Sequence, residues 1–299
     1  MGRFINPFTD MGFKRIFGQE VNKNLLIDFL NDLLEGEKRI IDITFLDKEQ
    51  LGTSVDDRSC NYDIYCENEN GERFIVEIQN CGHRNFKERA IYYLSRTIAN
   101  QGQKGPSWMF DLKAVYGVFF MNFHLDGRRQ ARFRTDVSLR DMRTNEPFSD
   151  KMRFIFLDLP AFTKDEETCE TDFERWIYVL KNMEILQRMP FKARKSVFEE
   201  LEKIADISAL SKEDQEKYEH IIKVYRDNLV TEQWAIEQGF KKGHEKGIEK
   251  GIEKGIEKGI EKGIEIERLK NARGMKAAGI APELIAQITG LSPEEIQEL

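Results

Sequence analysis

Residues 62–79, YDIYCENENGERFIVEIQ, hold two short runs in which apolar and polar side chains alternate. A period of two is typical of a β-strand whose two faces meet different surroundings. The segment Glu69-Asn70-Gly71 between the runs predicts a hairpin with a three-residue loop and a left-handed Gly71. A two-residue turn at Asn70-Gly71 would instead mix polar and apolar side chains on each face. The predicted loop therefore determines which residues of the two strands are opposite each other.

In this register two carboxylates, Asp63 and Glu77, face each other, and Gln79 lies two residues further along the same face. Like charges across a strand pair repel unless a cation neutralises them. Carboxylate oxygens suit Mg²⁺ or Mn²⁺, which lower the pKa of bound water. The residues taken alone favour the alternative of an ordinary solvent-facing polar side. The expected strand pairs are Asp63 with Glu77, Ile64 with Val76, Cys66 with Phe74 and Tyr62 with Ile78.

The segments around the hairpin predict a mixed α/β domain. An amphipathic segment at 9–18 begins with an N-cap at Thr9 or Asp10 and ends at Gly18. The segment LKAVYGVFFMNF is a continuous apolar run, typical of a strand that is covered on both faces. Helices are also expected at 22–36 and 83–102, and strands at 39–47, 130–139 and 151–159.

From about Asp165 onward the pattern is helical, with amphipathic segments at 170–184, 192–207 and 211–239. A repeat of Gly-Ile-Glu-Lys follows, and then a last segment with a turn at Gly290. These changes predict four parts: an α/β domain at 1–163, a helical domain at 164–238, the repeat at 239–267 and a helical hairpin at 268–299.

The repeat returns each residue type every four positions, so on a helix its stripes drift by about 40° per repeat. Each glycine costs about 1 kcal/mol relative to alanine in a helix interior. We therefore expect a marginal helix or an extended tether, with a glycine stripe for close helix contact as the alternative. The last segment has the spacing of a helix-turn-helix, but Glu294, Glu295 and Glu298 favour a protein-docking or oligomerising tail over DNA reading.

Composition limits the partners of the chain. Its net charge of -7 argues against DNA binding by bulk attraction, so any DNA contact is local. Arg132 and Arg134 share one face of an expected strand, which fits either a phosphate-binding surface or a solvated edge strand. No apolar run is long enough for a membrane span and no secretion signal is visible, which favours the cytoplasm. The four cysteines are too few for a disulfide framework.

Several segments together resemble the recombination-promoting nuclease and putative transposase family of the PD-(D/E)XK superfamily. They are NPFTDMGFKRIFG, LLIDFLNDLL, YDIYCENENGERFIVEIQ, FKERAIYYLSRTIANQGQKG and LKAVYGVFFMNF, and the C-terminal RLKNARGMKAAGIAPELIAQITGLSPEEIQEL is also similar. The resemblance implies a restriction-endonuclease-like mixed sheet flanked by helices, and metal-dependent cleavage of DNA.

The same resemblance assigns roles to residues. Asp63 matches the metal-binding aspartate, Glu77 the second acidic ligand, and Ile78 a third metal-binding position. Gln79 stands where the family often has lysine, and an amide cannot supply the positive charge of lysine. The resemblance further suggests Asp10 and Lys14 as accessory residues, and Arg84, Lys87 and Arg89 as DNA contacts.

Two hypotheses follow. The first is a Mg²⁺-dependent DNA endonuclease, with Mn²⁺ as a second possible ion, that acts in recombination or in the mobility of genetic elements. The second is a protein that keeps the nuclease fold but binds DNA or protein as an assembly module. In both cases the C-terminal helical region is expected to form homo-oligomers.

Overall fold

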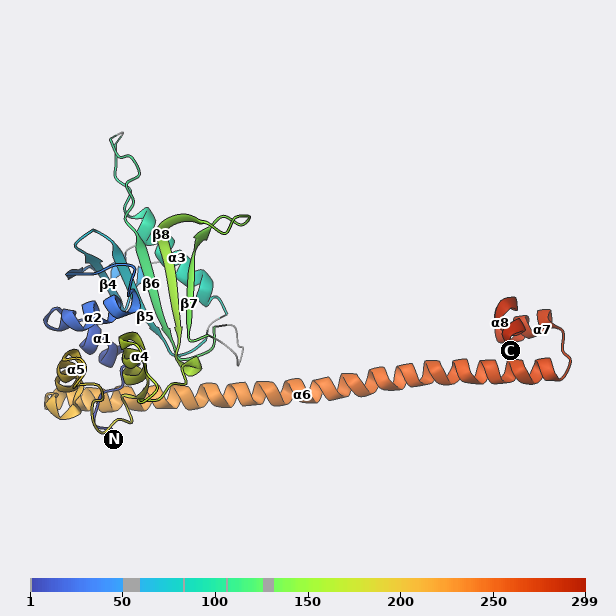
Figure 1. Ribbon diagram of the computed structural model, residues 1–299. Coiled ribbons are helices and arrows are strands. Elements are labelled where there is room, and N and C mark those ends of the chain that lie inside the picture. Colours follow the sequence, from blue (N-terminus) through green and yellow to red (C-terminus); the bar gives the residue numbers. More distant parts are fainter. Residues whose placement is uncertain (1, 51–59, 83, 106, 126–131) are drawn as a thin grey trace. The chain divides into compact units, whose positions relative to one another are not determined.

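The computed structural model describes residues 2–50, 60–82, 84–105, 107–125 and 132–299 (Figure 1). Its helices are α1 (Asp10–Phe17), α2 (Lys23–Leu33), α3 (Phe86–Ala99), α4 (Asp172–Asn182), α5 (Val197–Ala205), α6 (Lys212–Ala277), α7 (Pro282–Thr289) and α8 (Pro293–Glu298). Its strands are β1 (Ile43–Phe45), β2 (Glu49–Gln50), β3 (Cys60–Asn61), β4 (Ile64–Asn68), β5 (Arg73–Gln79), β6 (Val115–Met121), β7 (Arg134–Arg140) and β8 (Pro147–Asp158).

Six strands form a mixed sheet in the order β1-β4-β5-β6-β8-β7 (Figure 1). The strands β1, β4 and β5 pair antiparallel, β5, β6 and β8 run parallel, and β7 returns antiparallel along β8. Every residue of β6 is buried, as its continuous apolar run predicts. The predicted α/β class, with helices around a mixed sheet, is confirmed.

The β4–β5 hairpin has the predicted register. Ile64 pairs with Val76, and Cys66 pairs with Phe74. Gly71 lies in the left-handed region with a φ of 77°, and Asn68 N donates to Glu72 O at 2.9 Å across the loop. The three-residue loop and its left-handed glycine are therefore confirmed.

Tyr62 departs from the prediction. The strand period places it on the face of Ile64, yet it packs in a cluster with Tyr65 on the other side of the sheet. A bend at Asp63 separates β3 from β4, so the alternation restarts after that residue. The expected partner of Tyr62, Ile78, packs on the opposite face, in the cluster that contains Ile64. The prediction of a Tyr62–Ile78 pair was therefore wrong.

Two apolar clusters cover the two faces of the sheet. The larger one includes α1, α2, α4 and α5 and the even-numbered side chains of β5, while α3 covers the other face. The N-cap of α1 is Thr9, whose Oγ1 accepts from Gly12 N at 3.0 Å. A capping box at Thr171 starts α4. The two helices after the sheet thus complete the same core as the two helices before it.

An ion cluster ties these helices together. Asp28 of α2 accepts a hydrogen bond from Trp176 Nε1 of α4 at 2.8 Å. Lys195, just before α5, lies 2.8 Å from Asp28 Oδ2 and 2.5 Å from Asp32 Oδ2. A single ammonium therefore holds two carboxylates of α2 beside the buried Trp176.

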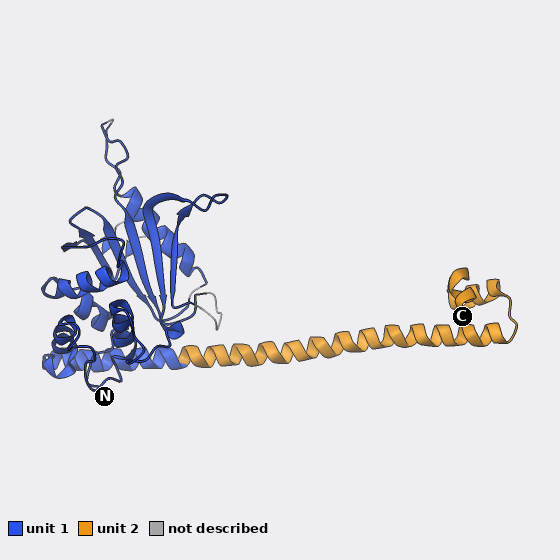
Figure 2. Ribbon diagram, viewed as in Figure 1, with its two compact units in different colours: residues 1–230 blue, residues 231–299 orange. Residues whose placement is uncertain are grey.

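The chain divides into two compact units, residues 1–230 and 231–299 (Figure 2). The helix α6 continues unbroken through the repeat, so the helical alternative is confirmed and the extended tether is not. In the second unit a small cluster joins the end of α6 to α7 and α8, with a left-handed Gly290 and a capping box at Ser292. The four-part division of the chain stays a prediction. Among the described helices, none combines the length and apolarity that a bilayer crossing requires.

Replacing Lys195 by Met is expected to lower the free energy of unfolding by about 2 kcal/mol, because two adjacent carboxylates would lose their cation. Urea denaturation followed by circular dichroism measures the change. The control is Lys203→Met, at an exposed position of α5, where a change below about 0.5 kcal/mol is expected. Equal stability of the two variants would contradict a structural role for the cluster.

Candidate metal and phosphate site

The Asp63 and Glu77 segments are joined by two crossed hydrogen bonds. Asp63 N donates to Glu77 Oε1 at 3.0 Å, and Ile78 N donates to Asp63 Oδ2 at 2.8 Å. The bend at Asp63 makes this possible, because it frees the backbone N–H of that residue from the regular ladder. Each carboxylate is thus oriented by the backbone of the other strand, and the predicted proximity of the two side chains is present.

Burial makes this pair of carboxylates electrostatically unfavourable. Glu77 is only 3% exposed and Asp63 is half-buried. Burial, followed by the negative charge of Asp63, raises the pKa of the Glu77 carboxyl to about 8. Burial also raises the pKa of Asp63, although the hydrogen bond from Ile78 opposes it. Both shifts are typical of acidic groups that share a site without a full countercharge.

Gln79 turns back onto its own strand. Its Nε2 donates to the backbone carbonyl of Ile78 at 3.0 Å. The amide therefore orients the carbonyl of the third predicted metal-binding position, and one donor of the amide is already used. A carbonyl oxygen has two lone pairs, so this bond leaves one of them available.

Two helices place cations around the pair. Arg89 of α3 lies with Nη2 3.7 Å from Glu77 Oε2, and its guanidinium also lies over the ring of Tyr93. Lys14 of α1 forms an ion pair with Asp10 at 2.5 Å, one helical turn away. The charges of Asp10, Lys14 and Arg89 all act on the pKa of Asp63. The predicted accessory residues are therefore close enough to influence the site electrostatically.

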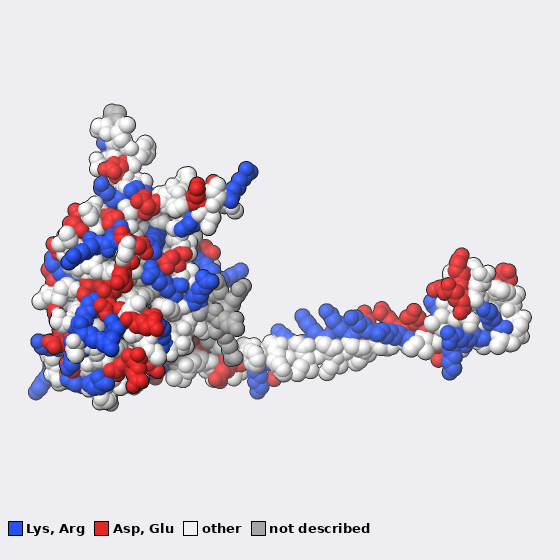
Figure 3. Space-filling view, viewed as in Figure 1, with Lys and Arg blue, Asp and Glu red and all other residues white. Residues whose placement is uncertain are grey.

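The other predicted DNA contacts differ in how far they are exposed. Arg84, Lys87 and Arg132 are exposed. Arg134 is held by Asp136 at 2.8 Å and donates to the carbonyl of Leu33 at 2.9 Å. A phosphate contact from Arg134 would require these bonds to break. On the visible face of the first unit, acidic and basic side chains are interspersed (Figure 3), which fits local contact with DNA.

The donor atoms of the pair fit a hard divalent cation. In the described part of the chain, Asp63 Oδ1 accepts no hydrogen bond, and Glu77 Oε2 faces only the Arg89 guanidinium. Two carboxylate oxygens and the Ile78 carbonyl form the kind of oxygen set that Mg²⁺ and Mn²⁺ take, with waters completing the shell. Among the described residues, no group of three or more His, Cys, Asp or Glu side chains is arranged around a metal position.

A family model described as PD-(D/E)XK nuclease family transposase matches residues 7–233. The chain belongs to this family. The match covers the sheet, the hairpin with its two carboxylates and the helices on both sides, so the six-stranded sheet is a restriction-endonuclease-like core, as predicted. No curated protein and no solved structure gave a significant match. Family membership indicates nuclease-type chemistry linked to mobile elements.

Two residues near the site carry no signal in the sequence. Lys48 lies opposite Tyr62, next to the bend at Asp63, but it precedes the hairpin in sequence and belongs to no motif. Asp158 is only 2% exposed and lies two strands from Gln79, in the same row across the sheet. Its Oδ1 is 3.1 Å from His124 Nδ1. Long-range pairing places both residues: the sheet register places Asp158, and the bond from Tyr62 N places Lys48.

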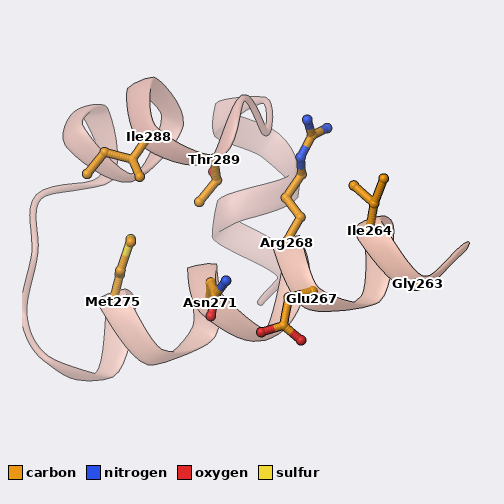
Figure 4. A pocket seen from close by; sticks show the side chains of 8 residues that line it. All are labelled: Gly263, Ile264, Glu267, Arg268, Asn271, Met275, Ile288 and Thr289. Atoms are coloured by element: carbon orange, nitrogen blue, oxygen red, sulfur yellow. The ribbon is translucent and has the colours of Figure 1, made fainter. Parts of the chain in front are cut away.

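A separate groove of about 460 Å³ lies in the second unit (Figure 4). Its lining has a single carboxylate, Glu267, and a single guanidinium, Arg268, among apolar, amide and hydroxyl side chains. This composition does not resemble the oxygen-rich site of the first unit.

The pKa of Glu77 predicts a pH-dependent stability. An acid whose folded-state pKa is raised stabilises the fold below its unfolded pKa, and this contribution is lost as pH rises through the folded value near 8. In metal-free buffer, the stability of Glu77→Gln relative to wild type is therefore expected to increase from pH 5 to pH 9. Thermal melting in EDTA measures the difference.

The matched control is Glu88→Gln, at an exposed acid of α3, which should show no such trend. A stability difference for Glu77→Gln that is constant across this pH range would contradict the burial of a charged carboxylate pair.

Proposed function

We propose that this chain is a DNA endonuclease that depends on Mg²⁺, or on Mn²⁺, and hydrolyses phosphodiester bonds in recombination or in the mobility of genetic elements. The observation that carries the proposal is the crossed pair of hydrogen bonds, which holds two carboxylates at one point and leaves an oxygen of each for an ion. Family membership supports the same chemistry. The proposed place of action is the cytoplasm.

In this proposal Asp63, Glu77 and the carbonyl of Ile78 would hold the ion. When bound, Mg²⁺ lowers the pKa of a water and neutralises charge on the phosphate. Gln79 fixes the direction of the Ile78 carbonyl through its 3.0 Å bond. Burial excludes bulk water from Glu77, which strengthens each electrostatic contact in the site.

The cations of α1 and α3 would attract and orient the DNA backbone. Arg89 lies beside Glu77. The exposed Arg84 lies just before the start of the same helix, and the exposed Lys87 lies in its first turn. Lys14 completes the set from α1, while Arg132 and Arg134 are proposed as more peripheral contacts. These contacts position phosphates and carry no sequence information by themselves.

Asp63→Ala is expected to reduce the rate of plasmid cleavage by at least about 100-fold, because it removes one ligand and the acceptor of the Ile78 bond. Nicking of supercoiled DNA by the purified protein, with and without Mg²⁺, measures the rate. Asp150→Ala, an exposed acid of β8, is the control and should cleave like wild type. Equal rates for Asp63→Ala and wild type would remove the proposed mechanism.

A second candidate function is a DNA- or protein-binding assembly module with weak or absent catalysis. The neutral Gln79 favours it, because an amide cannot neutralise the charge that develops on phosphate. Calorimetric titration with Mn²⁺ separates the two functions. The endonuclease should release or absorb heat that Asp63→Ala and Glu77→Gln abolish, whereas an assembly module should show no such dependence.

We also propose that the C-terminal helical region forms homo-oligomers. The isoleucines of the repeat are each more than half exposed in the described chain, which leaves apolar surface on α6. Lysines gather along one side of the repeat in Figure 3. The exposed isoleucines are Ile248, Ile252, Ile256, Ile260 and Ile264.

Removing residues 240–299 is expected to lower the oligomer size without abolishing cleavage, because residues 1–230 contain the whole apolar core of the first unit. Light scattering coupled to a sizing column measures the mass. If the particle contains the same number of subunits before and after truncation, oligomerisation through this region is contradicted.

A further inference from the structure

No cation follows Glu77 at the third position of the motif. Position 79 holds a neutral amide, and one of its donors is bonded to the Ile78 carbonyl at 3.0 Å. Hydrolysis of a phosphodiester adds negative charge to the phosphate oxygens in the transition state, and a positive group near them lowers the barrier. A cation from another element is therefore required if the proposed reaction is to be fast.

Two of the nearby cations are already paired. The guanidinium of Arg89 faces Glu77 Oε2 at 3.7 Å, and the ammonium of Lys14 is 2.5 Å from Asp10. Their charge is partly cancelled by these carboxylates before any DNA arrives. Neither of them is free to contact the phosphate without breaking an existing pair.

Lys48 differs from both. The segment after β1 continues alongside the hairpin, where Leu46 N donates to Tyr65 O at 2.8 Å and Tyr62 N donates to Lys48 O at 3.0 Å. These two bonds place Lys48 across from Tyr62, the residue next to the bend at Asp63. No other element brings a lysine backbone to this point in the described part of the chain.

The side chain of Lys48 is half-buried, and within the described residues it forms no ion pair and no hydrogen bond. Burial, followed by the charge of Lys14, lowers its pKa, while Asp10 and Asp63 raise it. Its ammonium is thus in the electrostatic field of Asp63. Partly burying an unpaired ammonium costs free energy, and such a cost is common where a side chain awaits a ligand.

We propose that Lys48 is a catalytic residue that contacts a non-bridging oxygen of the scissile phosphate, and so supplies the positive charge that residue 79 lacks. This inference rests on the proposed endonuclease function. In the reaction, the oxygen of a water bonds to phosphorus and one phosphorus–oxygen ester bond breaks. The water gives up a proton to solvent, and the displaced sugar oxygen takes one. The Lys48 ammonium keeps its protons and donates a hydrogen bond throughout.

Lys48→Gln tests the proposal. At saturating DNA and Mg²⁺, its cleavage rate is expected to fall by about 100-fold or more, as for the loss of a donor to a developing oxyanion. Its affinity for DNA measured with Ca²⁺, and its heat of Mn²⁺ binding, are expected to stay within about threefold of wild type, since one phosphate contact contributes little to either. Lys203→Gln is the matched control and should cleave like wild type.

A charge-relocation variant gives a result that a purely structural role would not produce. If the positive charge is what matters, Gln79→Lys in the Lys48→Gln background should recover at least about tenfold of the lost rate. Lys48→Arg, which keeps the charge, should retain more activity than Lys48→Gln. Thermal melting identifies folded variants, and Lys48→Met, which keeps the apolar stem, replaces any glutamine variant that does not fold.

The outcomes separate this inference from the function on which it rests. If wild type and Asp63→Ala cleave equally, the endonuclease proposal fails. If Asp63→Ala is inactive but Lys48→Gln and Lys48→Met cleave within threefold of wild type, only the role of Lys48 is overturned. A loss confined to DNA affinity, with an unchanged rate at saturation, would overturn it as well.

Discussion

The pair of crossed hydrogen bonds between Asp63 and the end of β5 is the contact on which the site depends. Each carboxylate accepts from a backbone N–H of the opposite strand. Backbone donors are rigid, so they fix the carboxylates better than another flexible side chain would. The bend at Asp63 is required for this arrangement, because a residue in the regular ladder would use its N–H for strand pairing.

This arrangement opposes stability. Glu77 is almost fully buried, and it lies on the α3 side of the sheet near the apolar cluster around Phe119 and Tyr62. The fold holds a second carboxylate beside it and offers Arg89 only at 3.7 Å. Groups kept in such unfavourable surroundings are concentrated at functional sites, where a ligand relieves the repulsion.

The helices after the sheet are part of the same core. Asn6 N donates to Tyr218 OH of α6 at 2.7 Å, and Ile5 N donates to the carbonyl of Ala205, the last residue of α5, at 2.9 Å. These bonds join the first residues of the chain to the region beyond residue 200. The family match, residues 7–233, includes these helices as well as the sheet.

The sequence by itself determined the hairpin, its three-residue loop and the face shared by Glu77 and Gln79, because strand alternation and the left-handed preference of glycine are local properties. It also determined the helices of the core through their apolar spacing. It gave the wrong face for Tyr62, since the bend at Asp63 is stabilised by the distant Glu77. Only the tertiary structure decided which cations lie near the pair: Lys14 comes from α1, Arg89 from α3 and Lys48 from the connection after β1, and only long-range packing brings them together.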